Sequence, residues 1–128
     1  MSVSSSRLGQ AGESAACEYL LSIGHVILER NYRSPYGEID IIAEIDGVMA
    51  IVEVKLRKND KFLPAYAAVG PRKQDKIKKS AMMWLSEQAR DYPLRLDVIE
   101  IYTGAAKLSA FGETYAAPKI NHIENAFY

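Results

Sequence analysis

The chain has 128 residues, enough for a single domain that buries roughly two-thirds of the surface its unfolded form exposes. Its one cysteine, Cys17, cannot form an internal disulfide. The lack of partner cysteines and of clustered histidines argues against a structural zinc site and for a reducing compartment. The formal net charge of zero is unlike that of a typical nucleic-acid-binding domain, so any such function must depend on how the charges are distributed.

The N-terminal part combines a short polar stretch with an amphipathic segment. Residues 1–6 lack the charged head and apolar run of a signal peptide and are expected to be flexible. No apolar run approaches the ~20 residues that span a bilayer, so we expect a cytoplasmic protein without membrane contact, folded as one domain over residues 1–128. The apolar spacing of residues 7–23 predicts a helix that ends before Gly24.

Glu13 stands on the apolar side of this helix. It precedes the four apolar residues of the stripe by three, four, seven and eight positions: Ala16, Cys17, Leu20 and Leu21. A carboxylate on the buried side is unexpected unless it has a function. The alternative is that Glu13 lies near the positive end of the helix dipole and bends out to solvent, and the spacing alone leaves both interpretations open.

A strand and a hairpin follow. Residues 25–33 are expected to form a strand with a turn at 34–37, and Asp46-Gly47 is a strong signal for a two-residue turn between two further strands. One face of this hairpin is wholly apolar and includes Ile39 with Ile41, whereas the other face becomes acidic toward the open end. We therefore expect the first face to lie in the core. The second face is expected to lie partly in the core and partly in a functional site at its acidic end.

The register of the hairpin brings charged side chains together. Counting back from the turn along both strands places Asp40 opposite Glu53 and Glu38 opposite Lys55. Like charges directly opposed on a sheet are destabilising, so we expect a cation between Asp40 and Glu53. Glu38 most simply forms a cross-strand ion pair that positions Lys55, and direct metal ligation by Glu38 is the less favoured interpretation.

The second half of the chain completes an α/β order. Residues 57–70 are expected to form a loop with a short ordered piece at 64–69, and Gly70-Pro71 opens a second helix that extends to about residue 89. Residues 95–102 read as a strand, and the remainder supplies an edge strand or a short closing helix. The order α-β-β-β-α-β-β predicts an α/β sheet with helices packed on it.

Positive charge is concentrated in one stretch. Between Lys55 and Lys79 there are nine basic residues against two acidic ones, a balance of +7 that leaves −7 for the rest of the chain. Such segregation fits a phosphate-facing edge beside an acidic centre, and the alternative is a solvated helix face with a charged loop. Lys73, on the buried side of the predicted second helix, either reaches phosphate or is an ordinary exposed lysine.

Asp40, Glu53 and Lys55 fit metal-assisted hydrolysis of a phosphodiester. Mg²⁺ takes oxygen ligands, typically one or two carboxylates with waters and substrate phosphate. Lys55 shares a face with Glu53 because side chains alternate along a strand, so it is placed to act on the attacking water or the scissile phosphate. The metal would lower the pKa of the water and hold a phosphoryl oxygen.

The motif Gly37-Glu38-Ile39-Asp40, followed thirteen residues after Asp40 by Glu53-Val54-Lys55, resembles the PD-(D/E)XK signature of the restriction-endonuclease-like superfamily. Ile39 stands where the superfamily often has proline. Nearly the whole chain resembles the YraN-type family of uncharacterised proteins more closely still. Besides these two motifs, the residues that carry this resemblance are Gly12-Glu13, Ala16, Tyr19-Leu20, Gly24, Asn31-Tyr32-Arg33, Val52, Arg57, Lys73, Arg95, Asp97-Val98 and Glu124-Asn125-Ala126-Phe127.

The resemblance implies a restriction-endonuclease-like fold, a mixed central sheet flanked by helices, with Asp40 and Glu53 as ligands of Mg²⁺ or Mn²⁺ and Lys55 as the catalytic lysine. Archaeal Holliday-junction resolvases of the superfamily carry a first-helix glutamate seven residues before a leucine. Glu13 and Leu20 have that spacing, so Glu13 is the expected third catalytic and metal-binding carboxylate. The implied activity is a metal-dependent endonuclease that acts on DNA rather than RNA, with branched or flapped DNA as candidate substrates and a homodimer as a possible assembly.

The remaining charged residues receive supporting roles. Glu38 is expected to support the site, and the alternative function is a non-catalytic nucleic-acid-binding or partner-binding module on the same fold. His25 and His122 have no partner at ligand or nucleophile spacing and read as ordinary residues, and Asp97 reads as a structural partner of Arg95. The basic residues expected to bind nucleic acid are Arg33, Arg57, Lys58, Lys73 and Lys76.

Overall fold

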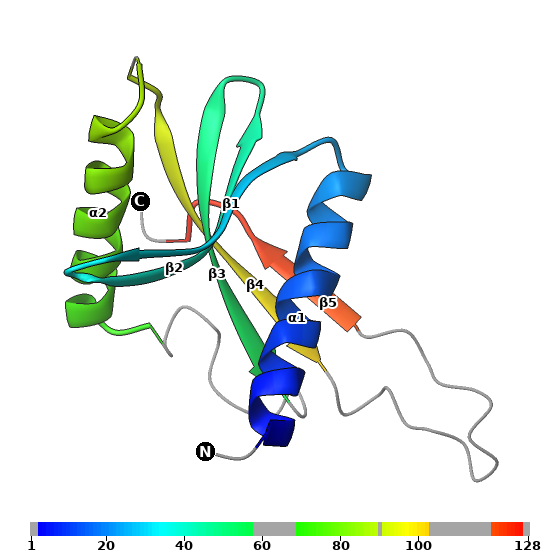
Figure 1. Cartoon of the computed structure of the whole chain (residues 1–128). Helices are drawn as coiled ribbons and strands as arrows, with labels where there is room; N and C mark the ends of the chain where they lie inside the picture. The colour runs from blue at the N-terminus through cyan, green and yellow to red at the C-terminus, as the bar shows by residue number, and fades with distance from the viewer. Residues whose placement is uncertain (1–2, 58–68, 90, 103–118, 127–128) are drawn as a thin grey trace, which may run out of the picture.

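Two helices flank a five-stranded sheet in the computed structural model, which describes residues 3–57, 69–89, 91–102 and 119–126 (Figure 1). The order of the elements is the predicted α-β-β-β-α-β-β, and the predicted α/β fold class is confirmed. The elements are α1 (Val3–Ser22), β1 (Val26–Ser34), β2 (Gly37–Ile45), β3 (Val48–Arg57), α2 (Pro71–Ser86), β4 (Leu94–Tyr102) and β5 (Lys119–Ile123).

The sheet is mixed, and its strands lie in the order in which they occur along the chain. The pairs β1–β2, β2–β3 and β4–β5 are antiparallel, whereas β3 and β4 are parallel. Parallel neighbours cannot be joined by a tight turn, and α2 lies in the crossover between them. This is the mixed central sheet flanked by helices that the sequence resemblance implied.

The two faces of the sheet carry two separate cores. Side chains alternate along each strand, so one face packs against α1 and the other against α2 (Figure 1). Leu20 of α1 lies in a buried cluster with Ile41 and Ile99. Trp84 of α2 lies in the other cluster, which includes Ile42. The sheet is thus the middle of three layers.

Element boundaries differ from the expected ones by a few residues. The helix α1 begins at Val3 rather than residue 7, and α2 ends at Ser86, three residues before the predicted end. The C-terminal segment forms the edge strand β5, which settles the alternative between a strand and a closing helix. The ordered piece expected at 64–69 lies outside the described residues, apart from the buried Val69.

The predicted Asp46-Gly47 turn is present. Both residues have positive φ, 50° for Asp46 and 78° for Gly47, as a two-residue turn matched to the strand twist requires. The predicted register is confirmed from Ile45–Val48 to Ile41–Val52. The hairpin therefore forms as its local sequence specifies.

Regular pairing between β2 and β3 stops at Ile41, contrary to the predicted register. Asp40 is not paired with Glu53, because its Oδ2 accepts a hydrogen bond from the backbone N–H of Val54 at 2.8 Å. The alternation of side chains also breaks here: Ile39 lies in the α2-side cluster, not on the face of Ile41 as predicted. Figure 1 shows the β1–β2 ribbon bending away from β3 toward α2 beyond this point.

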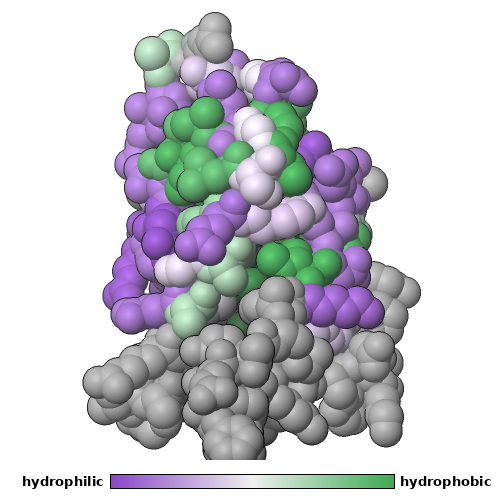
Figure 2. Space-filling model, turned by 90° about the vertical axis from the view of Figure 1, so that its right-hand side faces the viewer, coloured by the Kyte–Doolittle hydropathy of each residue, from purple (hydrophilic) through white to green (hydrophobic). Residues whose placement is uncertain are grey.

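An apolar patch lies on the surface where α1 ends and β1 begins. Leu21, Ile23, Val26 and Leu28 are exposed there, and Figure 2 shows apolar surface on this side of the molecule. The strand β1 is at the edge of the sheet and pairs only with β2 among the described strands. Exposed apolar patches of this kind on soluble domains often mark contact surfaces.

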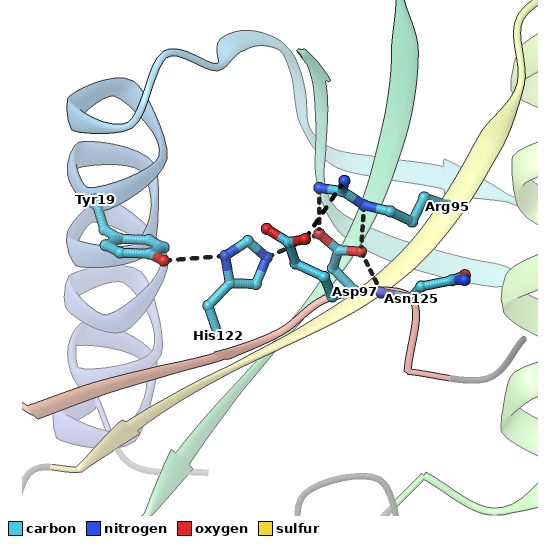
Figure 3. Close-up of polar contacts among 6 residues, drawn as sticks. Tyr19, Arg95, Asp97, His122 and Asn125 are labelled. Atoms are coloured by element: carbon cyan, nitrogen blue, oxygen red, sulfur yellow. Dashed lines mark hydrogen bonds and ion pairs between the residues drawn. The ribbon is translucent and has the colours of Figure 1, made fainter. Parts of the chain in front are cut away.

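A buried polar network joins α1, β4 and β5 (Figure 3). The Asp97 carboxylate has no solvent exposure and accepts two hydrogen bonds from Arg95 at 2.9 Å, one from His122 Nε2 at 2.8 Å and one from the Asn125 backbone N–H at 3.0 Å. His122 Nδ1 lies 3.0 Å from the Tyr19 hydroxyl of α1. The predicted Arg95–Asp97 pair is confirmed, and His122 joins it through contacts with Asp97 and Tyr19 that sequence spacing did not indicate.

The donors around Asp97 outweigh the cost of its burial. Burial alone would raise the pKa of this carboxyl, but the hydrogen bonds from His122, Arg95 and Asn125 hold the pKa below its ordinary value. A buried carboxylate with this many donors is a structural anchor. It fixes α1 and the C-terminal strand to the same region of the sheet.

Packing of α1 on the sheet can be tested with two neighbouring leucines. Leu20 is fully buried and Leu21 is 56% exposed. Leu20→Ala should lower the free energy of unfolding by about 3 kcal/mol, because it removes buried methyl groups and leaves a cavity. Leu21→Ala should change it by less than about 0.5 kcal/mol in the same urea titration. Equal losses in the two variants would contradict the assigned helix face.

His25 makes folding sensitive to mild acid. It is buried, and neither ring nitrogen has a hydrogen-bond partner among the described residues. Burial is the main reason why its pKa is lowered, with further contributions from His122 and Arg95, against the opposing effects of Asp97 and of the Leu20 backbone. In the unfolded state the His25 imidazole has a pKa of about 6.5 and binds a proton more readily than in the folded state. The stability contributed by neutral His25 is therefore present above pH ~6.5 and falls as the pH drops below that value.

The measurement is the free energy of unfolding at a series of pH values for the wild type and His25→Leu. The wild type should lose up to about 1.4 kcal/mol per pH unit more than the variant below pH ~6.5. Parallel pH profiles for the two proteins would contradict a neutral, buried His25.

Candidate functional site

Three carboxylates from α1 and β2 meet where the hairpin opens. Glu13, Glu38 and Asp40 each place an oxygen within 4.8 Å of the others. Glu13 reaches the sheet because the preceding Gly12 packs against β3, where a Cβ would lie 2.6 Å from a methyl of Leu56. The Glu13 side chain is 16% exposed, so it does not bend out to solvent. We call these three residues the carboxylate cluster.

Burial disfavours the ionised forms of two residues in the carboxylate cluster, Glu13 and Asp40. Burial and the charge of Asp40 raise the pKa of Glu13, against opposing effects of an Asn31 hydrogen bond and of Arg30, whose Nη2 lies 3.9 Å from Glu13 Oε2. Burial also raises the pKa of Asp40 despite the hydrogen bond from Val54. Both shifts mean that the ionised forms of Glu13 and Asp40 are disfavoured. A bound cation would lower both pKa values and so favour the ionised carboxylates.

Glu53 lies beside the carboxylate cluster and is held by two lysines. Its side chain is 4% exposed, and Oε2 lies 3.1 Å from Lys73 Nζ and 3.9 Å from Lys55 Nζ. Burial is the main cause of the raised pKa of Glu53, and the charge of Asp40 is the next. Lys73 of α2, whose side chain is 49% exposed, therefore reaches inward to an acidic partner.

The two lysines differ in their proton affinity. Burial and the neighbouring Lys73 lower the pKa of Lys55. Burial opposes protonation of Lys73 as well, but its ion pair with Glu53 raises its pKa above the ordinary value. Lys73 is thus the permanent counter-ion of Glu53, and Lys55 is the lysine that gives up its proton more readily.

Glu38 has a different partner from the predicted one. Its Oε2 lies 3.7 Å from Arg33 Nε, and no ion pair joins it to Lys55. The reason is the strand pairing: Arg33 lies opposite Glu38 in the β1–β2 ladder, while β2 has already separated from β3. This leaves Glu38 with the carboxylate cluster and Lys55 with Glu53.

The basic residues predicted to bind nucleic acid lie in different environments. Arg33 is exposed on the β1 edge. Arg57 is 14% exposed and its Nε lies 2.7 Å from Glu100, a position that favours a structural ion pair. Lys58 lies outside the described residues. Lys73 and Lys76 line a pocket beside the carboxylate cluster.

This pocket has a volume of about 470 Å³ between α2 and the turn after β1. Its wall includes Glu38 of the carboxylate cluster and Lys73, the ion-pair partner of Glu53. Sequence reasoning missed three of its side chains, for which the positive stretch and the 34–37 turn were the only signals: Tyr36, Arg72 and Ser80.

The donor set fits a hard divalent cation. Mg²⁺ and Mn²⁺ prefer carboxylate oxygens, and the carboxylate cluster offers one from each of three residues. The predicted ligands were Asp40, Glu53 and Glu13. The geometry brings Glu13 and Asp40 together, adds Glu38, and leaves Glu53 next to Asp40 but bound by lysines.

The fold and this site define an α/β protein with an acidic centre and two lysines at the open end of a hairpin. Residues 12–101 match the model of the uncharacterised protein family UPF0102, and the chain belongs to this family. The YraN-type resemblance found in the sequence is thereby confirmed. No helix of the described residues is long and apolar enough to cross a membrane.

Relatives align along nearly their full length. A UPF0102 protein of Thermodesulfovibrio yellowstonii is 44% identical over 121 residues, which cover 94% of this chain and 96% of the relative. UPF0102 proteins of Syntrophomonas wolfei and Geotalea uraniireducens are each 40% identical over 121 residues, covering 94% of this chain and 96% and 88% of the relatives. The similarity therefore includes every element of the candidate site.

Neutralising one cluster carboxylate should stabilise the metal-free protein. Glu13→Gln removes a partly buried charge that Asp40 repels, so the free energy of unfolding at neutral pH in chelator should rise by about 0.5–1 kcal/mol. Glu18→Gln, on the exposed side of the same helix, is the matched control and should have little effect. A loss of stability in Glu13→Gln would show that its charge is already compensated.

Proposed function

We propose that this protein is a metal-dependent nuclease that hydrolyses phosphodiester bonds of DNA, with Mg²⁺ or Mn²⁺ as cofactor. The observation that carries the proposal is the carboxylate cluster, whose oxygens lie within 4.8 Å of one another beside a buried glutamate flanked by two lysines. Perturbed carboxyl and lysine pKa values next to a pocket are typical of catalytic sites.

The three residues of the carboxylate cluster would hold the cation, and Glu53 would complete its surroundings. A divalent cation in such a site lowers the pKa of a coordinated water and polarises a phosphoryl oxygen. Asp40 is fixed in orientation by the Val54 N–H, so its second oxygen remains available as a ligand. Glu13 and Glu38 approach from α1 and β2 respectively.

Lys55 is the residue that would act on the reacting atoms. Its lowered pKa and partial exposure suit a group that takes a proton from the attacking water or stabilises charge on the scissile phosphate. Lys73 would keep Glu53 ionised and in place. The motif Glu53-Val54-Lys55 thereby combines an acidic group and a lysine on one face of β3.

Nucleic-acid binding would depend on the basic residues around the pocket and on Arg33. Phosphate contacts by lysine and arginine supply most non-specific affinity for DNA, and a local positive edge serves this purpose in a protein of zero net charge. We propose DNA, with branched or flapped structures as substrates, and a cytoplasmic location. The exposed apolar patch beside edge strand β1 supports a homodimer, in which two sites make two cuts (Figure 2).

The test is cleavage of labelled duplex, flapped and four-way-junction DNA in Mg²⁺ or Mn²⁺. Wild type should cut at least one of these, and chelator should abolish cutting. Asp40→Asn and Lys55→Met should each reduce the rate by about 100-fold or more, because the first removes a ligand of the cation and the second removes the group that acts on the reacting atoms.

Glu44→Gln is the control, because Glu44 is a carboxylate of β2 outside the carboxylate cluster. It should cut like wild type. Equal rates for wild type and Lys55→Met would refute the catalytic role of Lys55. Binding of DNA without any cleavage would favour the non-catalytic nucleic-acid-binding alternative.

A further inference from the structure

The pocket next to the carboxylate cluster has the size and lining of a site for a small planar group with an attached anion. Its 470 Å³ falls within the range of about 300–1,000 Å³ that small-ligand sites occupy. Tyr36 provides an aromatic side chain, Ile77 an apolar surface, and Arg72 and Lys76 positive charge. A nucleotide has this combination of a flat base and a phosphate.

Tyr36 is held in place before any ligand binds. Its backbone N–H donates to Ser34 Oγ at 3.0 Å, and the Ser34 hydroxyl lies 2.7 Å from the hydroxyl of Ser80, which is buried in α2. The turn that carries Tyr36 is thus tied to the helix that carries the cations. Such preorganisation reduces the entropy lost on binding.

Positive charge continues past Tyr36. The Lys79 ammonium lies 5.9 Å from the centroid of the Tyr36 ring, a distance typical of a cation–π contact. A second hollow on that side is lined by Tyr36 and Lys79 as well. Tyr36 therefore stands between two basic hollows, as an aromatic residue does in a path for single-stranded nucleic acid.

We propose that this pocket binds an unpaired nucleotide of a DNA strand, with its base against Tyr36 and its phosphate at Arg72 and Lys76. The proposal rests on the proposed function, because Glu38 and Lys73 are shared between the pocket and the candidate catalytic site. The substrate class is then DNA in which a nucleotide next to the scissile phosphate is unpaired. A base inside a duplex is stacked and paired and cannot enter a pocket of this size.

The experiment measures binding by fluorescence anisotropy in chelator, so that no cleavage occurs. Three labelled probes are used: a blunt DNA duplex, the same duplex with a single-stranded thymidine tail, and that duplex with a tail of abasic nucleotides. The abasic tail keeps the phosphates and removes the bases. Wild type should bind the thymidine tail about tenfold more tightly than the abasic tail, because stacking on an aromatic side chain strengthens binding by roughly this much per base.

Variants separate the base from the phosphate. Tyr36→Leu should bind both tails equally, and Tyr36→Phe should keep the preference for bases. Tyr36 is 46% exposed, so its replacement should leave the fold intact, which circular dichroism checks. Lys76→Ala should weaken binding of both tails and reduce the salt dependence, whereas Lys119→Ala, an exposed lysine on β5, should not.

The outcomes distinguish this proposal from the nuclease proposal. Equal affinity of wild type for the three probes, or a base preference that persists in Tyr36→Leu, would overturn the nucleotide pocket even if the protein cuts DNA. A Tyr36-dependent preference in a protein that cuts nothing would support the pocket and refute the nuclease.

Discussion

The position of Asp40 is the constraint on which the rest of the site depends. Its carboxylate accepts a hydrogen bond from the Val54 N–H, and regular pairing between β2 and β3 ends at the neighbouring Ile41. Beyond that point β2 leaves β3 and runs with β1 to α2, which moves Glu38 away from Lys55 (Figure 1). The opening between the two strands is where Glu13 enters from α1.

Two aspartates, the buried Asp97 and the half-buried Asp40, show that burial alone does not define a functional group. Asp97 accepts four hydrogen bonds, two of them from an arginine, and its pKa is lowered in spite of burial. Asp40 accepts one hydrogen bond from a backbone N–H, and burial raises its pKa in spite of that bond and of the nearby Lys73 and Lys55. The first is compensated by the protein itself and anchors the fold. The second is less fully compensated, and a carboxyl group with a raised pKa beside a pocket is a candidate functional group.

The predictable parts of the structure are those set by local signals. Asp46-Gly47 specifies the turn and therefore the register near it, and the alternation of helix and strand patterns specifies the fold class. The face of Ile39 was predicted wrongly because strict alternation does not anticipate a side chain that replaces a strand partner. The bond between Tyr19 and His122 joins residues 103 positions apart, for which spacing carries no information. The incorrect pairing of Glu38 with Lys55 has the same cause, because it too assumed that regular pairing of β2 with β3 continues past Ile41.

A divalent cation held by Glu13, Glu38 and Asp40 is the central claim, and crystallography with Mn²⁺ tests it most directly. Crystals grown or soaked with Mn²⁺ should give an anomalous difference peak within coordination distance of oxygens from all three carboxylates, and Asp40→Asn crystals treated in the same way should lack it. No peak at the cluster in wild-type crystals, or a peak that persists unchanged in Asp40→Asn, would contradict a metal centre at this position.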